Sequence, residues 1–205
     1  MKTFLRAPKP SNTIRLFIIF FMGTWLGNAQ ISTTTGLEIY KPETEIQPDI
    51  YWQVKAYRPD AQLLNVKVIN KDGAYHDVKA IQNSEETSIL DVKAFVNGER
   101  LPIKLIVKDN DRYYPAKAIA SDGTLVDFKA ITEKGEILPI KGVSKSGNIV
   151  HLRAIAQDNV FYNIVAISPE GEVNNVKGIK MLNTTVETVI NGVSIFAHIK
   201  AIPQK

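Results

Sequence analysis

The 205-residue sequence contains no cysteine, only three histidines, and 8% aromatic residues. Without cysteine the fold cannot depend on disulfides, and thiol catalysis, thiolate metal sites and lipoprotein acylation are excluded. His76, His151 and His198 are far apart in the sequence, so no pair has metal-ligand spacing. A glycine-rich phosphate loop, a nucleophile elbow and a zinc-peptidase motif are also missing. We therefore expect no metal, no cofactor and no catalytic residue.

A large net charge is missing as well, once the first 29 residues are set aside. These residues carry four basic side chains and no acidic one, which leaves 21 of the 25 basic residues against 21 acidic ones. A formally neutral chain lacks the broad cationic surface that nucleic acids attract. No nucleic-acid partner is expected.

Residues 1–29 have the pattern of a secretory signal peptide. A basic start precedes the apolar run LFIIFFMGTWL at 16–26, and Gly27 and Ala29 place small residues before a cleavage site. The run is only about half as long as the roughly twenty residues of a membrane-spanning helix, which favours cleavage over anchoring. We expect export to the periplasm, the outer membrane or the extracellular space.

From residue 54 onward the chain repeats a short core, most often every twelve residues, in which a basic residue stands between apolar ones in every unit but IVAI at 164. The units are VKAY at 54, VKVI at 66, VKAI at 78, VKAF at 92, IKLI at 103, AKAI at 116, FKAI at 128, IKGV at 140, LRAI at 152, IVAI at 164, VKGI at 176 and IKAI at 199. Turn signals such as KDG at 71, SDG at 121 and KSG at 145 separate them. This spacing is typical of strands joined by three-residue hairpin loops, so successive strands should be antiparallel.

The hairpin loops also predict a register. Lys129 should lie opposite Pro139, and two residues further along the same ladder Asp127 should lie opposite Lys141. Applied to every unit, this register alternates each lysine with aspartate, asparagine or proline. Like charges would then be separated by an intervening strand.

Alternating side chains give each strand an apolar face and a face with a polar centre. The third apolar position is small in most units, which indicates close packing inside the fold; it is occupied by Ala80, Ala94, Ala118, Ala130, Gly142, Ala154, Ala166 and Gly178. We predict an all-β fold, an antiparallel meander of about twelve to thirteen strands rolled into a flattened barrel or a sandwich-like sheet.

Three prolines, Pro102, Pro115 and Pro139, fall inside the predicted strands, where proline cannot donate to a ladder. They predict either local bulges or strands that consist of two short parts meeting at a bend. The sequence does not distinguish the two.

The predicted organisation has three parts. The signal peptide is followed by a linker with a possible first strand at 30–52 and by a single β-repeat domain at 53–205. An insert at 181–194 interrupts the repeat. Its TTVE segment matches a helix capping box, whereas its β-branched run before Asn191-Gly192 favours another hairpin.

Tandem β-hairpin units resemble MORN repeats in architecture, although the Tyr-x-Gly and Trp/Phe positions of those repeats are not found here. From residue 38 to the end, phrases such as DVKAI and SPEGEVNNVKGIK are similar to uncharacterised exported proteins of Bacteroidetes-type bacteria. The leader ending Asn-Ala-Gln is also similar to theirs. The resemblance implies an envelope or extracellular location and no known activity.

The polar face is the candidate binding surface, either for an anionic polymer or as a solvated face whose charges pair with one another. The residues singled out are Lys117, Lys129, Lys141, Arg153, Asp127 and His151. We expect a non-catalytic envelope protein, a scaffold or binding module, with an envelope glycan or another envelope protein as partner. The alternatives are a small outer-membrane β-barrel, disfavoured by short strands and few aromatics, and a hydrolase with unrecognised carboxylates.

Overall fold

A computed structural model describes residues 48–109 and 112–204, which belong to the second of the two compact units into which the chain divides. The predicted signal peptide lies outside the described residues. The strands are β1 (Ile50–Tyr57), β2 (Leu64–Ile69), β3 (Tyr75–Gln82), β4 (Leu90–Val96), β5 (Glu99–Ile106), β6 (Tyr114–Ile119), β7 (Leu125–Ile131), β8 (Ile137–Ser146), β9 (Ile149–Ile155), β10 (Phe161–Ile167), β11 (Val173–Ile179), β12 (Thr188–Ile190) and β13 (Val193–Pro203). Within the described residues, no helix is long and apolar enough to cross a membrane.

The all-β, antiparallel prediction is confirmed. All thirteen strands belong to one sheet, and its ladders are antiparallel. Side chains alternate as the repeat predicts: in β7, Val126, Phe128 and Ala130 are buried, whereas Asp127 and Lys129 lie on the other face. The turn chemistry is also as expected, because Asn97 and Gly98 both adopt positive φ between β4 and β5.

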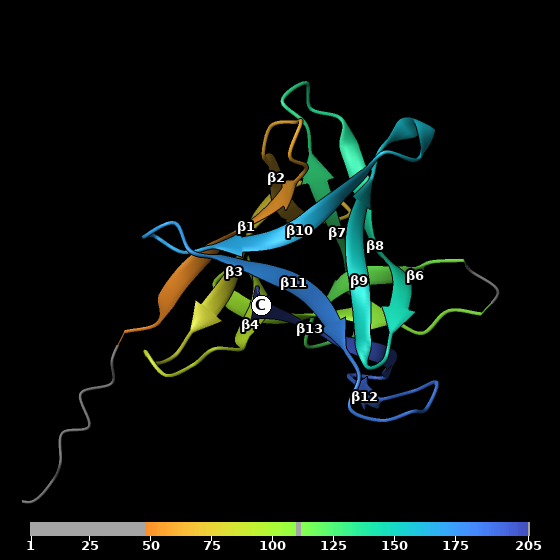
Figure 1. Ribbon diagram of the computed structural model, residues 1–205. Helices are drawn as coiled ribbons and strands as arrows, with labels where there is room; N and C mark the ends of the chain where they lie inside the picture. Colours follow the sequence, from red (N-terminus) through yellow and green to blue (C-terminus); the bar gives the residue numbers. More distant parts are fainter. Residues whose placement is uncertain (1–47, 110–111, 205) are drawn as a thin grey trace, which may run out of the picture. The chain divides into compact units, whose positions relative to one another are not determined.

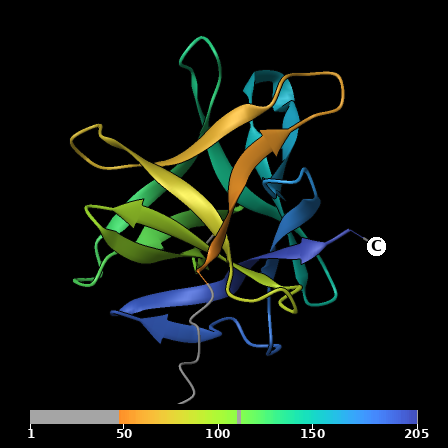
Figure 2. The ribbon, with the colours of Figure 1, turned by 90° about the vertical axis from the view of Figure 1, so that its left-hand side faces the viewer.

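Eleven of the twelve longer strands pair with three neighbours rather than two, and β13 pairs with β12 in addition to its three. In β7, residues 125–127 pair with β6, residues 127–131 with β2, and residues 129–131 with β8. A strand can do this because its two ends follow different partners on the same edge. Figures 1 and 2 show the resulting sheet, in which neighbouring strands cross one another instead of following one axis.

These pairings divide the strands into four groups of three, which we call hubs. Within a hub every strand pairs with the other two; hub A is β1, β2 and β3, hub B is β4, β5 and β13, hub C is β6, β7 and β8, and hub D is β9, β10 and β11. Single ladders join each hub to each of the others, namely β1–β10, β2–β7, β3–β4, β5–β6, β8–β9 and β11–β13. Four hubs that are all joined to one another have the connectivity of a tetrahedron, so the sheet closes on itself. Figure 1 shows hub D as the triangle where β9, β10 and β11 meet.

The predicted register is right near the loops and wrong beyond them. Lys129 does lie opposite Pro139. However, Lys141 lies opposite Pro115 and Arg153, not opposite Asp127. The reason is that the β7–β8 ladder ends at Pro139, after which β8 turns to β6 and β9 to close hub C.

This change of partner also explains the prolines. Pro102, Pro115 and Pro139 each occupy the last residue of one ladder, and the next residue of the strand begins another. A residue without an N–H is tolerated there because the hydrogen-bond pattern is interrupted in any case. Of the two predictions for these prolines, local bulges or strands made of two short parts, the second is therefore correct. The register shifts of β8 and β13 lie elsewhere, between Gly142 and Ser144 and between Ile195 and Ala197.

The interior is lined by the apolar faces of all four hubs. The small residues allow close contact there, as predicted. A Cβ built on Gly178 would lie 2.7 Å from Cδ1 of Leu105, and one built on Gly142 would lie 2.9 Å from the same atom. Leu105 is completely buried, so residues of hubs B, C and D pack together at this point.

The insert forms a hairpin, not a helix. β12 pairs with β13 through a turn in which Asn191 and Gly192 have positive φ. The Glu187 side chain does not cap a helix; its two carboxylate oxygens accept hydrogen bonds from the backbone N–H groups of Met181 and Leu182, at 3.0 and 2.8 Å. The connection between β8 and β9 also differs from the prediction. Lys145 and Ser146 of the predicted KSG loop belong to β8, and the chain turns only at Gly147, which has positive φ.

Candidate functional site

Each hub carries a ring of polar positions on the outer face. Each of the twelve hub strands has two outward positions, two residues apart. We call the first the paired position and the second the cationic position, because the second is basic on every hub strand except β10, where it is Val165. Around a hub, each cationic position lies opposite the paired position of a neighbouring strand. In hub C the three pairs are Lys117–Asp127, Lys129–Pro139 and Lys141–Pro115. The twelve-residue repeat thus produces a three-fold charge pattern at each hub.

The six predicted binding residues fall in two hubs. Lys117, Lys129, Lys141 and Asp127 all belong to hub C, whereas Arg153 and His151 belong to hub D. The two sets adjoin, because Lys141 lies opposite Arg153 on the β8–β9 ladder. The structure therefore groups the predicted residues, but not as one continuous row.

Hub C has one carboxylate among three lysines. Asp127 accepts a hydrogen bond from Lys117 and lies 3.2 Å from Nζ of Lys129. Burial by itself raises the pKa of Asp127, but the hydrogen bond and the charges of these two lysines outweigh it and hold the pKa below its usual value. The carboxylate therefore stays ionised, and the hub keeps a formal charge of +2.

Hubs A and B repeat this arrangement. In hub A, Asp77 accepts a hydrogen bond from Lys67, and in hub B, Asp91 accepts one from Lys200. In hub A the hydrogen bond from Lys67 is the main cause that lowers the pKa of Asp77. In hub B burial raises the pKa of Asp91, but the hydrogen bond and the nearby lysine charges outweigh it and lower the pKa. Each of these hubs also has three lysines at its cationic positions, listed here as Lys55, Lys67 and Lys79 in hub A and Lys93, Lys104 and Lys200 in hub B.

Lys104 is the most strongly perturbed cation of hub B. Burial, and after it the positive charges of Lys93 and Lys200, lower its pKa from 10.5 to about 8, although the charge of Asp91 acts in the opposite direction. Its Nζ lies 2.9 Å from Nδ1 of His198 and donates to that nitrogen when the ring is neutral. Positive charge is thus crowded in this hub in spite of its aspartate.

Hub D has no carboxylate in its ring. Its cationic positions are Arg153, Val165 and Lys177, and its paired positions are Asn163, Asn175 and His151. Burial lowers the pKa of Arg153, and burial together with the Arg153 charge lowers the pKa of Lys177. The pKa of His151 is lowered by burial and by both cations, so the neutral ring accepts a hydrogen bond from Lys177 at 3.2 Å.

The ladders between hubs bring like charges together. In five of the six, a basic residue lies directly opposite another basic residue; the pairs are Lys67–Lys129, Lys79–Lys93, Lys104–Lys117, Lys141–Arg153 and Lys177–Lys200. The predicted separation of like charges by an intervening strand is therefore wrong. It assumed that each hairpin register continues across the sheet, whereas the strands change partners at the hubs.

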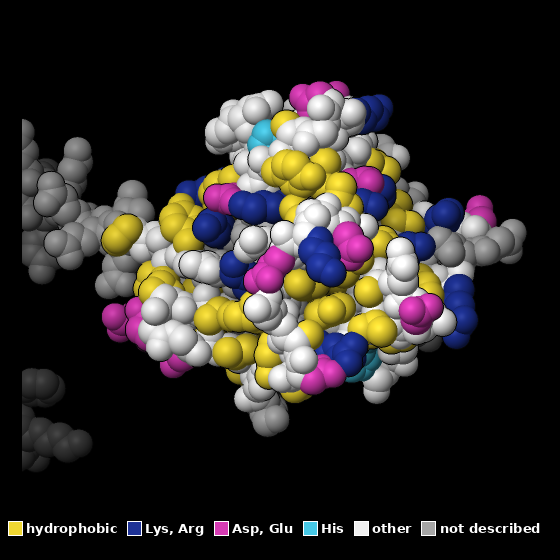
Figure 3. All heavy atoms as spheres, turned by 90° about the horizontal axis from the view of Figure 1, so that it is seen from above, with side chains coloured by type: hydrophobic (Ala, Val, Ile, Leu, Met, Phe, Trp, Pro, Cys, Tyr) yellow, Lys and Arg dark blue, Asp and Glu magenta, His cyan; other side chains and the backbone are white. Residues whose placement is uncertain are grey.

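A pocket of about 480 Å³ lies beside hub C. Lys117, Asp127 and Lys129 line it together with the loop residues Asn70 and Lys71. The remaining lining is aliphatic, from Ile69, Leu125 and Ile137. Figure 3 shows a surface of the same character, with lysine and arginine side chains beside carboxylates and hydrophobic side chains between them. Such a surface offers ion pairing next to apolar contact.

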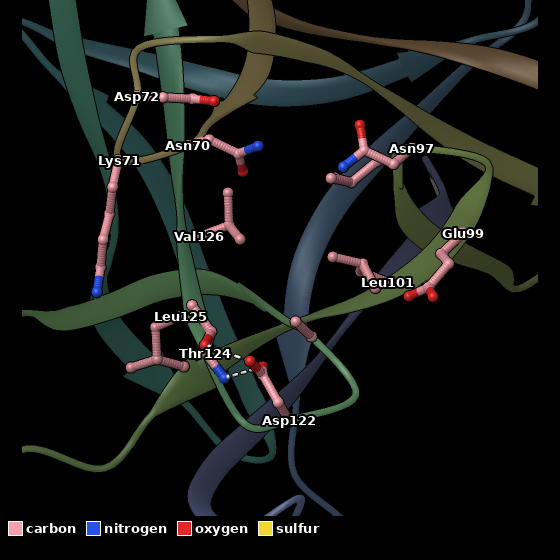
Figure 4. Close-up of a pocket in the computed structure, with 12 residues that line it drawn as sticks. Asn70, Lys71, Asp72, Asn97, Glu99, Leu101, Asp122, Thr124, Leu125 and Val126 are labelled. Atoms are coloured by element: carbon pink, nitrogen blue, oxygen red, sulfur yellow. Dashed lines mark hydrogen bonds between the residues drawn. The ribbon is translucent and has the colours of Figure 1, made fainter.

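A second pocket, of about 440 Å³, opens between three hairpins from hubs A, B and C (Figure 4). Asp72, Asn97 and Asp122 come from the three turns, and Val126 and Leu101 lie deeper. The sequence singled out these residues only as turn formers, and the structure agrees, since Asn97 has positive φ in its turn and the two aspartates bond to their own loops. Asp72 accepts a hydrogen bond from the N–H of Ala74, and Asp122 accepts one from Thr124.

The described residues contain no group of three or more histidine, aspartate or glutamate side chains placed to hold a metal ion.

The hub grouping was not deduced from the sequence, but a signal for it existed. The five three-residue loops at 71–73, 121–123, 133–135, 157–159 and 169–171 all lie within hubs. Three of the four connections between hubs along the chain are longer, at 83–89, 107–113 and 180–192 if β12 is included. Irregular spacing therefore marks most of the places where the chain leaves one hub for the next.

Comparison with known proteins adds family membership. No curated protein and no solved structure matches the chain. Residues 48–202 match a family of unknown function, DUF7486, over nearly all of the sheet just described. The chain therefore belongs to this family.

Proposed function

We propose that the protein is a non-catalytic, exported scaffold and binding module of the cell envelope, and that its cationic hubs bind an acidic glycan. The observation that carries the proposal is the crowding of like charges. Each hub has two more cations than carboxylates, and five ladders set cation against cation. Two like charges about 5 Å apart repel by roughly 1 kcal/mol even in water. A bound anion relieves this repulsion at several hubs at once.

The closed sheet supports a scaffold role. Its apolar faces fill the interior, so the outward face is left for partners, and the lysines are held by strands instead of loops. Rigid positioning lowers the entropy that binding costs. The architectural likeness to MORN repeats, which are also tandem hairpins, fits the same role.

The proposed location follows from the signal-peptide pattern of residues 1–29 and from the likeness of phrases such as DVKAI to exported Bacteroidetes-type proteins. An acidic glycan suits this location because uronic acids or phosphates on a polymer repeat along the chain. Several weak hub contacts then add by multivalency. Another envelope protein with an acidic surface is the second partner to consider.

The test is affinity electrophoresis of the full chain in gels that contain polygalacturonate, with neutral dextran as the control. We expect retardation by the acidic polymer alone, lost as sodium chloride rises from low to about 0.5 M because surface charges are screened. Equal mobility in both gels at low salt would overturn the glycan proposal. Fractionation of the native cells checks the location, and recovery in the cytoplasm would overturn export.

A further inference from the structure

Hub D differs from the three other hubs in one respect. In hubs A, B and C one paired position holds an aspartate, Asp77, Asp91 or Asp127, and that aspartate accepts a hydrogen bond from the lysine opposite it. In hub D all three paired positions are neutral at pH 7, since they are two asparagines and a histidine. The cations of hub D therefore lack the internal counter-ion that the same geometry supplies elsewhere.

The cations of hub D are also partly withdrawn from water. Arg153 donates one hydrogen bond, from Nη1 to the carbonyl of Leu152 at 3.0 Å, and Lys177 donates to His151. Both acceptors are neutral. Val165, which takes the third cationic position, is only 3% exposed although it is on the outer face, so neighbouring side chains cover it. The charge of the hub is therefore carried by Arg153 and Lys177 alone, and both contact neutral groups.

We propose that hub D is the specific oxyanion site of the protein and binds the carboxylate of one uronic acid residue. The bound carboxylate takes the place of the aspartate that the other hubs supply. This inference rests on the proposed function and names the hub and the chemical group that it uses.

The residues around hub D suit a sugar acid. The planar guanidinium of Arg153 can donate two parallel hydrogen bonds to one carboxylate, which lysine cannot do. The amides of Asn163 and Asn175 can both donate to and accept from ring hydroxyls. Phosphate can also accept hydrogen bonds from Arg153 and from the amides, but it has no sugar ring whose hydroxyls could use both the donor and the acceptor of each amide.

The experiment is a titration of the full chain with glucuronate, followed by NMR of the backbone amides, the asparagine side chains and the histidine rings. Glucose and inorganic phosphate are separate arms. We expect glucuronate to shift signals of β9, β10 and β11, to raise the pKa of His151 because the anion favours its charged form, and to bind at least 10-fold more tightly than phosphate. Glucose should have no effect.

Two variants test the counter-ion argument directly. Asn163→Asp places a carboxylate opposite Arg153, in the register that Asp127 has opposite Lys117, and should weaken glucuronate binding at least 10-fold. Asp127→Asn makes the reverse change in hub C and should create a second, weaker glucuronate site there. Lys134→Gln, in the exposed loop between β7 and β8, is the matched control and should leave the affinity of hub D within about twofold. If Asn163→Asp does not fold, Arg153→Gln is the substitute variant, and it should also weaken glucuronate binding at least 10-fold.

The proposal is overturned if Asn163→Asp or Arg153→Gln binds glucuronate as the unmodified chain does, if the shifts spread evenly over all hubs, or if phosphate binds more tightly. The polymer assay separates the two proposals. If polygalacturonate retards the Asn163→Asp variant as much as the unmodified chain, hub D is not the binding site, but the protein still binds acidic glycans. Glucuronate binding at hub D without retardation keeps the site but removes the proposed function.

Discussion

Hubs C and D have the same backbone pattern and the same formal charge, but they reach that charge in different ways. Hub C has three lysines and Asp127, whereas hub D has Arg153 and Lys177 with no carboxylate in its ring. Ion pairs inside hub C hold part of its charge, while the cations of hub D interact with neutral groups. The comparison teaches that two hubs of equal net charge can differ in whether their cations have an internal partner, and the proposed glucuronate site rests on that difference.

Adding a side-chain carbon beneath either hub should destabilise the fold to a similar extent, since the packing there does not depend on charge. Gly142→Ala in hub C and Gly178→Ala in hub D each put a Cβ against Leu105, so each should lower the free energy of unfolding by about 1–3 kcal/mol. Urea unfolding measures the loss. Leu105→Ala alone should lower the free energy of unfolding by about 2–5 kcal/mol. In a double variant with Leu105→Ala, either glycine change should be less destabilising than it is alone, because the clash with Leu105 is gone. Full additivity would contradict the shared contact.

Charge exchange should affect the two hubs in opposite directions. Asp127→Asn removes the partner of Lys117 and Lys129 and should cost up to about 1 kcal/mol at low salt, a modest value because the groups are partly exposed. Asn163→Asp should stabilise hub D by a similar amount. Both effects should shrink in about 0.5 M sodium chloride, which urea midpoints at two salt concentrations can show. Effects of the same sign would count against the comparison.

Hub B offers a test of crowding by pH. The folded pKa of Lys104, about 8, lies below its ordinary value of 10.5, so the unfolded chain binds more protons between these values. Stability should therefore rise with pH from about 8 to 10.5, by roughly 1 kcal/mol after solvent screening. Thermal unfolding across this range measures the rise. The Lys104→Met variant should lack it, and a rise of full size in that variant would assign the effect to another group.

The smallest effect is expected at the prolines, which occur in hubs B and C but not in hub D. Pro139→Asn gives hub C the residue type that hub D has at two paired positions. Since the β7–β8 ladder ends at Pro139, restoring an N–H there should change the free energy of unfolding by no more than about 0.5 kcal/mol. A larger gain in urea unfolding would mean that the ladder continues past residue 139.

Much of the fold could be predicted from the repeat. The strands, the antiparallel hairpins, the inward Val and Ala positions and the left-handed turn residues such as Asn97 and Gly98 all follow from period-2 alternation and local turn chemistry. The register next to each loop follows as well, as Lys129–Pro139 shows.

The candidate site could be predicted only in part. Lys117, Lys129 and Lys141 were recognised as outward residues, but the sequence did not show that they share one hub or that Arg153 belongs to the next. The like-charge pair of Lys67 and Lys129 joins strands that are far apart in the chain, and a hairpin repeat says nothing about such a pair.

The sequence by itself determined which residues face inward, where the chain turns and which strands meet as hairpins, because these depend on neighbours a few residues apart. Only the tertiary structure decided which strand takes the remaining edge of each hairpin, and hence which charges share a hub. That choice depends on how the whole sheet closes around Leu105 and the small residues that face it, and closure is a property of all the strands together.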